Sequence, residues 1–118
     1  MSIQLHNILF LDIETVPQHD GHENMPDEWK TLWELKASYL IRNKETETSQ
    51  SIYSRAGIYA EFGKIICTSC GVMQGIGQEK KLILKSFCGH DEKLLLHQFS
   101  ETLNKWCSDG NKIGRAHV

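Results

Sequence analysis

The chain has 118 residues and a formal net charge of −2, which fits one domain with a modest core. Hydrophobic residues make up 40% and charged residues 24%, as is usual for globular proteins. The near-neutral charge excludes a strongly basic nucleic-acid clamp, but not an enzyme that holds nucleic acid through metal ions.

The sequence shows no export signal, because its early apolar run, Ile8–Leu11, is too short for one and ends in acid. No run approaches the length of a membrane span. We therefore expect a cytoplasmic protein that does not interact with membranes. In that compartment cysteines stay reduced, so we expect free thiols at all four cysteines: Cys67, Cys70, Cys88 and Cys107.

The first predicted element is a strand at Ile8–Ile13, a continuous apolar run that ends in acid. Such runs are typical of strands that are covered on both faces in the middle of a sheet. Val16-Pro17 then turns the chain out of regular structure. The polar segment Gln18–Pro26 contains a glycine and predicts a loop.

A long excursion with two predicted helices follows. The first is an amphipathic helix over Asp27–Arg42, with Pro26 just before it. Asn43–Ser51 reads as a solvated linker, and Ser51–Phe62 predicts a shorter helix that Gly63 stops. Apolar residues recur at helical spacing in the first helix: Trp29, Leu32, Trp33, Ala37, Leu40 and Ile41.

The second half of the chain predicts a hairpin and a helix. Strands at Lys64–Met73 and Lys80–Cys88 are joined by a turn with two glycines at Gln74–Glu79, so they should be antiparallel. Asp91–Cys107 predicts an amphipathic helix. A central first strand needs neighbours on both sides, so this sheet of three strands looks incomplete. The apolar stripe of the last helix comprises Leu95, Phe99, Leu103 and Trp106.

Two acids, Asp12 and Glu14, end the first predicted strand. Residues two apart on a strand point to the same face, with Cα atoms roughly 6.5 to 7 Å apart. Carboxylates at that spacing can converge on one or two hard cations such as Mg²⁺. The bare Asp-x-Glu pattern is common by chance, and acids at a strand end are often simply solvated. The apolar strand before them and the proline after them make the pattern more specific.

Three segments in order carry a resemblance to a known family: "ILFLDIETVP", "AGIYAEFGKIICTSCGV" and "SFCGHDEKLLLHQF". The first resembles the first motif of the DEDD 3′→5′ exonucleases, which have an α/β, ribonuclease H-like fold. All three together resemble the predicted 3′→5′ exonucleases related to the B-family DNA polymerase proofreading domain. The resemblance extends to about Lys112 and implies a five-stranded mixed sheet whose first three strands form an antiparallel meander.

The resemblance also implies roles for residues of the first motif. Asp12 would be the carboxylate that bridges two Mg²⁺ or Mn²⁺ ions. Glu14 would be the second ligand and would help to orient the attacking water. Thr15 would lie beside the terminal nucleotide at the 3′ end of a nucleic acid, expected to be single-stranded DNA. Two-metal hydrolysis of the terminal phosphodiester would release a nucleoside monophosphate.

The chain departs from the family after its last predicted helix. The second and third motifs would begin where the chain reads "GNKIGRAHV", and neither Asp109 nor His117 fits them. We therefore expect residues 1–112 to be the N-terminal part of an exonuclease domain, inactive without its later strands. The tail Ile113–Val118, "IGRAHV", reads like a translated sequencing adapter, and we expect residues 113–118 to be artefactual.

Two other functions compete with the exonuclease. One is a nucleic-acid-binding module of the same fold without catalysis. The other is a small zinc protein that uses Cys67, Cys70, Cys88 and His90. Spacing argues against zinc, because residues three apart on a straight strand point to opposite faces.

Four further residues allow both a structural and a functional interpretation. His19 and His22 flank "DG" in a polar loop, so we expect solvated side chains, although contact with substrate or metal is the alternative. Trp29 and Trp33 lie at helical spacing and predict core packing, with base stacking as the alternative.

Overall fold

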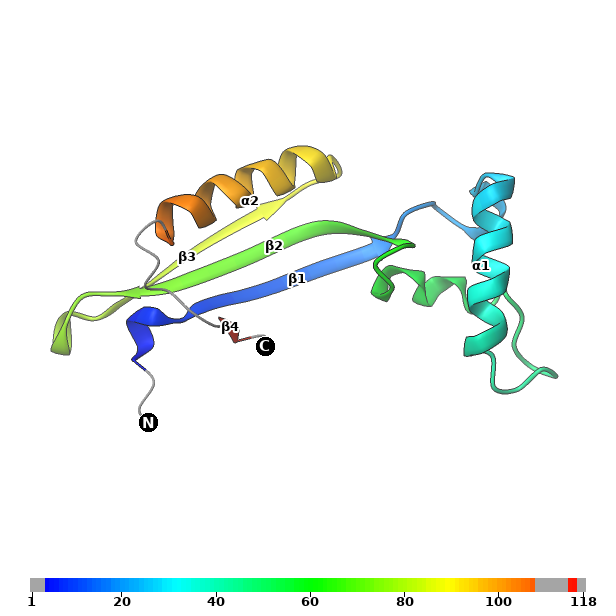
Figure 1. Ribbon diagram of the computed structural model, residues 1–118, viewed down its shortest axis with the longest axis horizontal. Coiled ribbons are helices and arrows are strands. Elements are labelled where there is room, and N and C mark those ends of the chain that lie inside the picture. The colour runs from blue at the N-terminus through cyan, green and yellow to red at the C-terminus, as the bar shows by residue number, and fades with distance from the viewer. Residues whose placement is uncertain (1–3, 108–114, 117–118) are drawn as a thin grey trace. The chain divides into compact units, whose positions relative to one another are not determined.

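The computed structural model describes residues 4–107 and 115–116 (Figure 1). The chain divides into two compact units. The sheet unit is Met1–Glu14 with Ile65–Val118, and the aromatic unit is Thr15–Lys64. Nothing in the length or composition indicated this division.

The strands form one sheet with the order β3-β2-β1-β4. The first three strands in the chain are antiparallel neighbours, as the sequence predicted, and with the helices they give an α/β protein. The short fourth strand pairs parallel to β1, with Leu9 opposite Arg115. This strand falls in the tail that was expected to be foreign, and it gives β1 a neighbour on its second side. The strands are β1 (Leu9–Pro17), β2 (Gly63–Gln74), β3 (Lys81–Cys88) and β4 (Arg115–Ala116).

Strand β1 is less covered than its apolar sequence predicted. Its residues from Leu9 to Asp12 are half-buried, and Ile13 is 39% exposed. The strand has neighbours within the sheet, but hydrogen-bonded neighbours cover strand edges and leave the faces open. The prediction of a strand buried on both faces is therefore wrong. The strand extends past its predicted end at Ile13 and ends at Pro17, where the sequence predicted that the chain leaves regular structure.

The hairpin of β2 and β3 has a register that assigns its side chains to two faces. Residues directly opposite each other share a face, and Cys70 lies opposite Lys85. Thr68, Cys70 and Val72 are buried on this face, whereas Ser69 and Leu84 belong to the other, more open face. The hairpin turn uses two glycines with positive φ, which favours glycine: Gly75 at +91° and Gly77 at +64°.

Helix α2 (Glu92–Trp106) runs along one side of the sheet and packs on β3 (Figure 1). Leu95 is only 2% exposed, and the other three residues of the predicted stripe are half-buried. The helix begins with Asp91, whose side chain accepts a hydrogen bond from the Leu94 N–H at 3.1 Å. The predicted helix is thus confirmed, and its apolar stripe is buried at Leu95 and half-buried at the other three residues.

The aromatic unit is built around helix α1 (Asp27–Leu40). Trp33 is fully buried, and its ring meets those of Phe62 and Tyr53 edge-on, at centroid distances of 5.1 and 5.5 Å. Its indole N–H donates to the Ser49 carbonyl oxygen at 2.7 Å. The predicted helix is confirmed. Its apolar stripe differs from the prediction at Leu32, whose side chain is 54% exposed.

The shorter predicted helix at Ser51–Phe62 is wrong in type and extent, because this segment forms a 3₁₀ helix over Tyr53–Ile58. A Cβ on Gly57 would lie 2.9 Å from the Val16 carbonyl carbon, so the chain packs here with backbone against backbone. Gly63, the expected helix stop, begins β2 instead. The other 3₁₀ turns are Leu5–Asn7, His22–Asn24 and Gly77–Glu79.

No helix in the described part of the chain has the length and apolar character that crossing a membrane would require.

Candidate functional site

Asp12 and Glu14 lie on β1 within the sheet unit. Because side chains alternate along a strand, both carboxylates point to the same face of the sheet. Asp12 is half-buried and Glu14 is exposed. The pair is therefore reachable from solvent, which a site for a hydrated cation and a large substrate requires.

Thr15 follows the pair directly and begins the aromatic unit, where it is half-buried. The expected contact of Thr15 with a terminal nucleotide stays a prediction.

The donor set of the carboxylate pair fits a hard divalent cation, although it is small. Mg²⁺ is often held by one or two carboxylates, with water and substrate phosphates completing its shell. Within residues 4–107 and 115–116, no three His, Cys, Asp or Glu side chains are grouped so that they could hold a metal ion. Asp109 and His117, which the sequence had excluded as ligands, lie outside the described residues.

The cysteines are not four reduced thiols, since a disulfide joins Cys67 on β2 to Cys88 on β3. The two residues are directly opposite in the register, and their Cα atoms are 4.1 Å apart. The neighbouring residue pair in the register is hydrogen-bonded through the Gly89 N–H. Hydrogen-bonded and non-hydrogen-bonded pairs alternate along two antiparallel strands, so Cys67 and Cys88 form a non-hydrogen-bonded pair, whose side chains lie closer together. The bond uses two of the four residues of the zinc hypothesis and removes its ligand set.

The remaining described cysteines, Cys70 and Cys107, are free thiols. Burial raises the pKa of the Cys70 thiol, although the positive charge of Lys85 opposes the shift. A raised pKa disfavours the reactive thiolate. Cys70 therefore behaves as a small core residue on the face that α2 covers.

The loop histidines are not solvated as expected. His22 is buried at 9% exposure, and its ring lies 6.1 Å from that of Tyr53. The backbone of His19 is bound at both ends by Tyr53, whose hydroxyl accepts from the His19 N–H and donates to its carbonyl oxygen. These histidines help to fold the aromatic unit. Trp29 and Trp33 pack in the core, as predicted.

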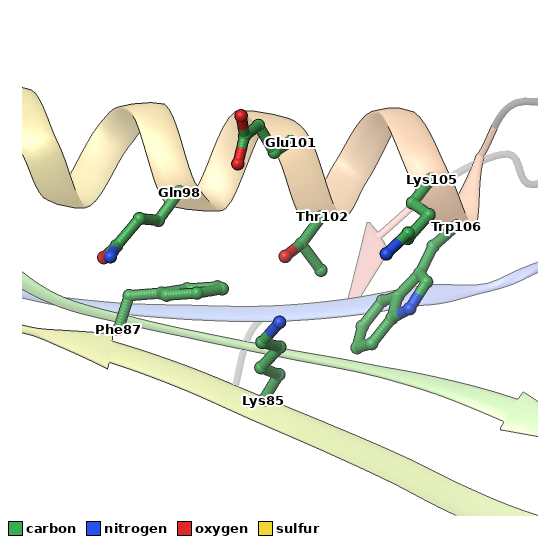
Figure 2. Close-up of a pocket in the computed structure, with 7 residues that line it drawn as sticks. All are labelled: Lys85, Phe87, Gln98, Glu101, Thr102, Lys105 and Trp106. Carbon is green, nitrogen blue, oxygen red and sulfur yellow. The ribbon is translucent and has the colours of Figure 1, made fainter.

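A pocket that the sequence did not predict lies between β3 and α2 in the sheet unit (Figure 2). The helix residues that line it recur at positions i, i+3, i+4, i+7 and i+8, and the strand residues are two apart. The same spacing is present in the sequence, but exposed polar residues at helical spacing usually indicate a solvated face. The lining residues are Lys85, Phe87, Gln98, Glu101, Thr102, Lys105 and Trp106.

Comparisons with known proteins found no relative of this chain. No protein-family profile matches the sequence, no curated protein matches it, and no solved structure matches it.

Proposed function

We propose that residues 1–112 are the N-terminal part of a ribonuclease H-like 3′→5′ exonuclease domain. The observation that carries the proposal is the pair of carboxylates at Asp12 and Glu14, which share one face of β1 and are reachable from solvent. The three antiparallel strands and the helix after them agree with the order that this fold requires. The substrate would be the 3′ end of a single-stranded nucleic acid, with DNA as the expected form.

In this proposal Asp12 and Glu14 hold Mg²⁺ or Mn²⁺. When two such ions are bound about 4 Å apart, they activate a water and stabilise the leaving oxygen of a phosphodiester. The backbone of Thr15 would meet the terminal nucleotide. Each of these roles follows from the resemblance of "DIET" to the first exonuclease motif, and the solvent-reachable carboxylates support it.

Two carboxylates do not complete the metal centre that the family uses. We propose that the remaining acids and the general base belong to sequence that follows Lys112 in the parent gene, in place of residues 113–118. The 118-residue chain alone would then be inactive.

The test is hydrolysis of a 3′-labelled single-stranded DNA by the parent protein and by the 118-residue chain. The proposal expects Mg²⁺- or Mn²⁺-dependent release of labelled nucleoside monophosphate by the parent, and loss of that activity in Asp12→Asn and Glu14→Gln. Glu34→Gln, on an exposed part of α1, is the matched control and should keep full activity. A parent protein that binds the DNA without degrading it would identify a non-catalytic binding module instead.

A cytoplasmic location stays a prediction, and one observation counts against it. Disulfides are rare in the cytosol, where thiols are kept reduced, yet Cys67 and Cys88 are joined. The redox state of this pair in protein isolated from its own cells, with thiols trapped by alkylation at lysis, tests the location.

A further inference from the structure

The pocket between β3 and α2 is large enough for a small organic ligand. Its volume is about 420 Å³, and sites for small molecules typically span roughly 300 to 1,000 Å³. All of its lining residues belong to the sheet unit. Of the described lining residues, two come from β3 and five from α2 between Gln98 and Trp106, so regular elements position the side chains.

Two cations give the pocket a positive character. Lys85 extends from β3 toward the helix, and Lys105 extends from the helix toward the strand (Figure 2). Among the described residues that line the pocket, Glu101 is the one acid, and its side chain lies across the helix in this view. It also lies 3.2 Å from the Nε2 atom of His97, one turn back on the outer side of the helix. The described lining thus carries two ammonium groups and one carboxylate, a net positive charge that attracts an anionic ligand.

Two aromatic rings supply flat apolar surface beside these cations. Phe87 lies on the floor of the pocket, and the Lys85 Nζ atom is 5.2 Å from the centre of its ring. The half-buried Trp106 stands at the far end of the pocket. Gln98 and Thr102 add an amide and a hydroxyl, which can donate and accept hydrogen bonds at the edge of a planar ring.

We propose that this pocket binds a nucleotide. The phosphate would contact Lys85 and Lys105, and the base would stack on Trp106, because a planar base joined to an anion matches rings beside ammonium groups. The proposal deepens the proposed function and rests on it only for the choice of a nucleotide among planar aromatic anions. A free nucleoside monophosphate and one unit of a single strand share this chemistry.

The experiment is a titration of the whole 118-residue chain, labelled with ¹⁵N, followed through its tryptophan indole N–H signals. EDTA is present, so that binding is measured without any metal at Asp12 and Glu14. The probes are thymidine 5′-monophosphate, a short oligothymidylate and inorganic phosphate. Trp106→Phe identifies the Trp106 signal, and the buried Trp33 indole, which is bonded to Ser49, serves as the internal reference.

The proposal expects a saturable shift of the Trp106 signal with a thymidylate probe and no shift at Trp33. Preference for the monophosphate or for the oligomer shows which source the pocket takes. Lys85→Ala and Lys105→Ala should each weaken binding by about tenfold, since each removes a charged contact to phosphate. Lys93→Ala removes an exposed lysine at the other end of α2, and it should leave binding unchanged.

Three results would overturn the proposal. They are no shift at Trp106 with either thymidylate, an equal loss of binding in Lys93→Ala, or the same response to inorganic phosphate alone. Thermal melts by circular dichroism confirm that each variant is folded. Asp12→Asn should still bind the thymidylate, so failure of the exonuclease and failure of this pocket give different results.

Discussion

The carboxylate of Glu92 accepts a hydrogen bond from the backbone N–H of Ile65 at 2.6 Å. This contact joins the first turn of α2 to the start of β2 within the sheet unit. It places an acid where the helix dipole also favours one. The contact therefore fixes the end of the helix that lies farthest from the pocket.

Replacing Glu92 with alanine should destabilise the sheet unit, because a partly buried N–H loses a charged acceptor. The expected cost is about 1.5 to 3 kcal/mol in the free energy of unfolding, measured with urea. Glu79→Ala in the exposed hairpin turn is the control, and it should change stability by less than about 0.5 kcal/mol. Equal effects of the two substitutions would show that the contact does not contribute.

The Cys67–Cys88 disulfide predicts a definite thiol count. Unfolded protein that has not been treated with reductant should show two free thiols, Cys70 and Cys107, and a reduced sample should show four. Cys67→Ser should lower the free energy of unfolding by about 3 kcal/mol, the usual effect of opening a loop of this length. Four free thiols in the untreated protein would restore the original expectation of reduced cysteines.

Tyr53 predicts a loss of stability in alkali. Burial raises the pKa of its hydroxyl above the ordinary value, and the hydrogen bond from the His19 backbone opposes the shift. Folding therefore favours the neutral phenol. This contribution is complete below the unfolded pKa of about 10 and is lost as the pH rises through the folded pKa.

Thermal melts between neutral pH and strong alkali should show this loss in the wild type, followed by near-ultraviolet circular dichroism. Tyr53→Phe removes the titrating group and should flatten the alkaline slope. It should also lower stability at neutral pH, because both hydrogen bonds to His19 are lost. An unchanged slope in this variant would assign the alkaline loss to other groups.

The stability of the aromatic unit should depend strongly on the side chain of Trp33. Trp33→Ala would empty the centre of the core and should cost about 3 to 5 kcal/mol. Leu32→Ala alters the neighbouring, largely exposed position and should be close to neutral. The measurement is loss of the dispersed aromatic NMR signals on heating, and similar melting of the two variants would contradict the assigned core.

Much of the fold could be predicted, because the spacing of apolar residues along the chain indicates which face of a helix is buried. The spacing of apolar residues located α1 and α2, and Asp91 marked the start of α2. The segment around Gly57 could not be predicted, since close backbone packing against Val16 depends on tertiary structure. The same limit applies to His22, a polar residue in a loop that tertiary contacts bury.

The candidate site was predictable only in part. Asp12 and Glu14 stand out because charge follows an apolar strand, and the structure places them on one face of β1. The disulfide was not predicted, because pairing of Cys67 with Cys88 depends on the register of two strands. The pocket could not be predicted, because lysines on a helix usually indicate a solvated face. Only the packing of α2 on β3 brings these lysines close to aromatic rings.

The central claim is that Asp12 and Glu14 act together as ligands of a divalent cation. Titration of the ¹⁵N-labelled chain with Mn²⁺ tests it directly, since the bound ion broadens the signals of nearby amides. The account predicts early, selective broadening around residues 12 to 14 that excess Mg²⁺ reverses and that Asp12→Asn or Glu14→Gln abolishes. Broadening that begins elsewhere, or that persists unchanged in Asp12→Asn and Glu14→Gln, would contradict it.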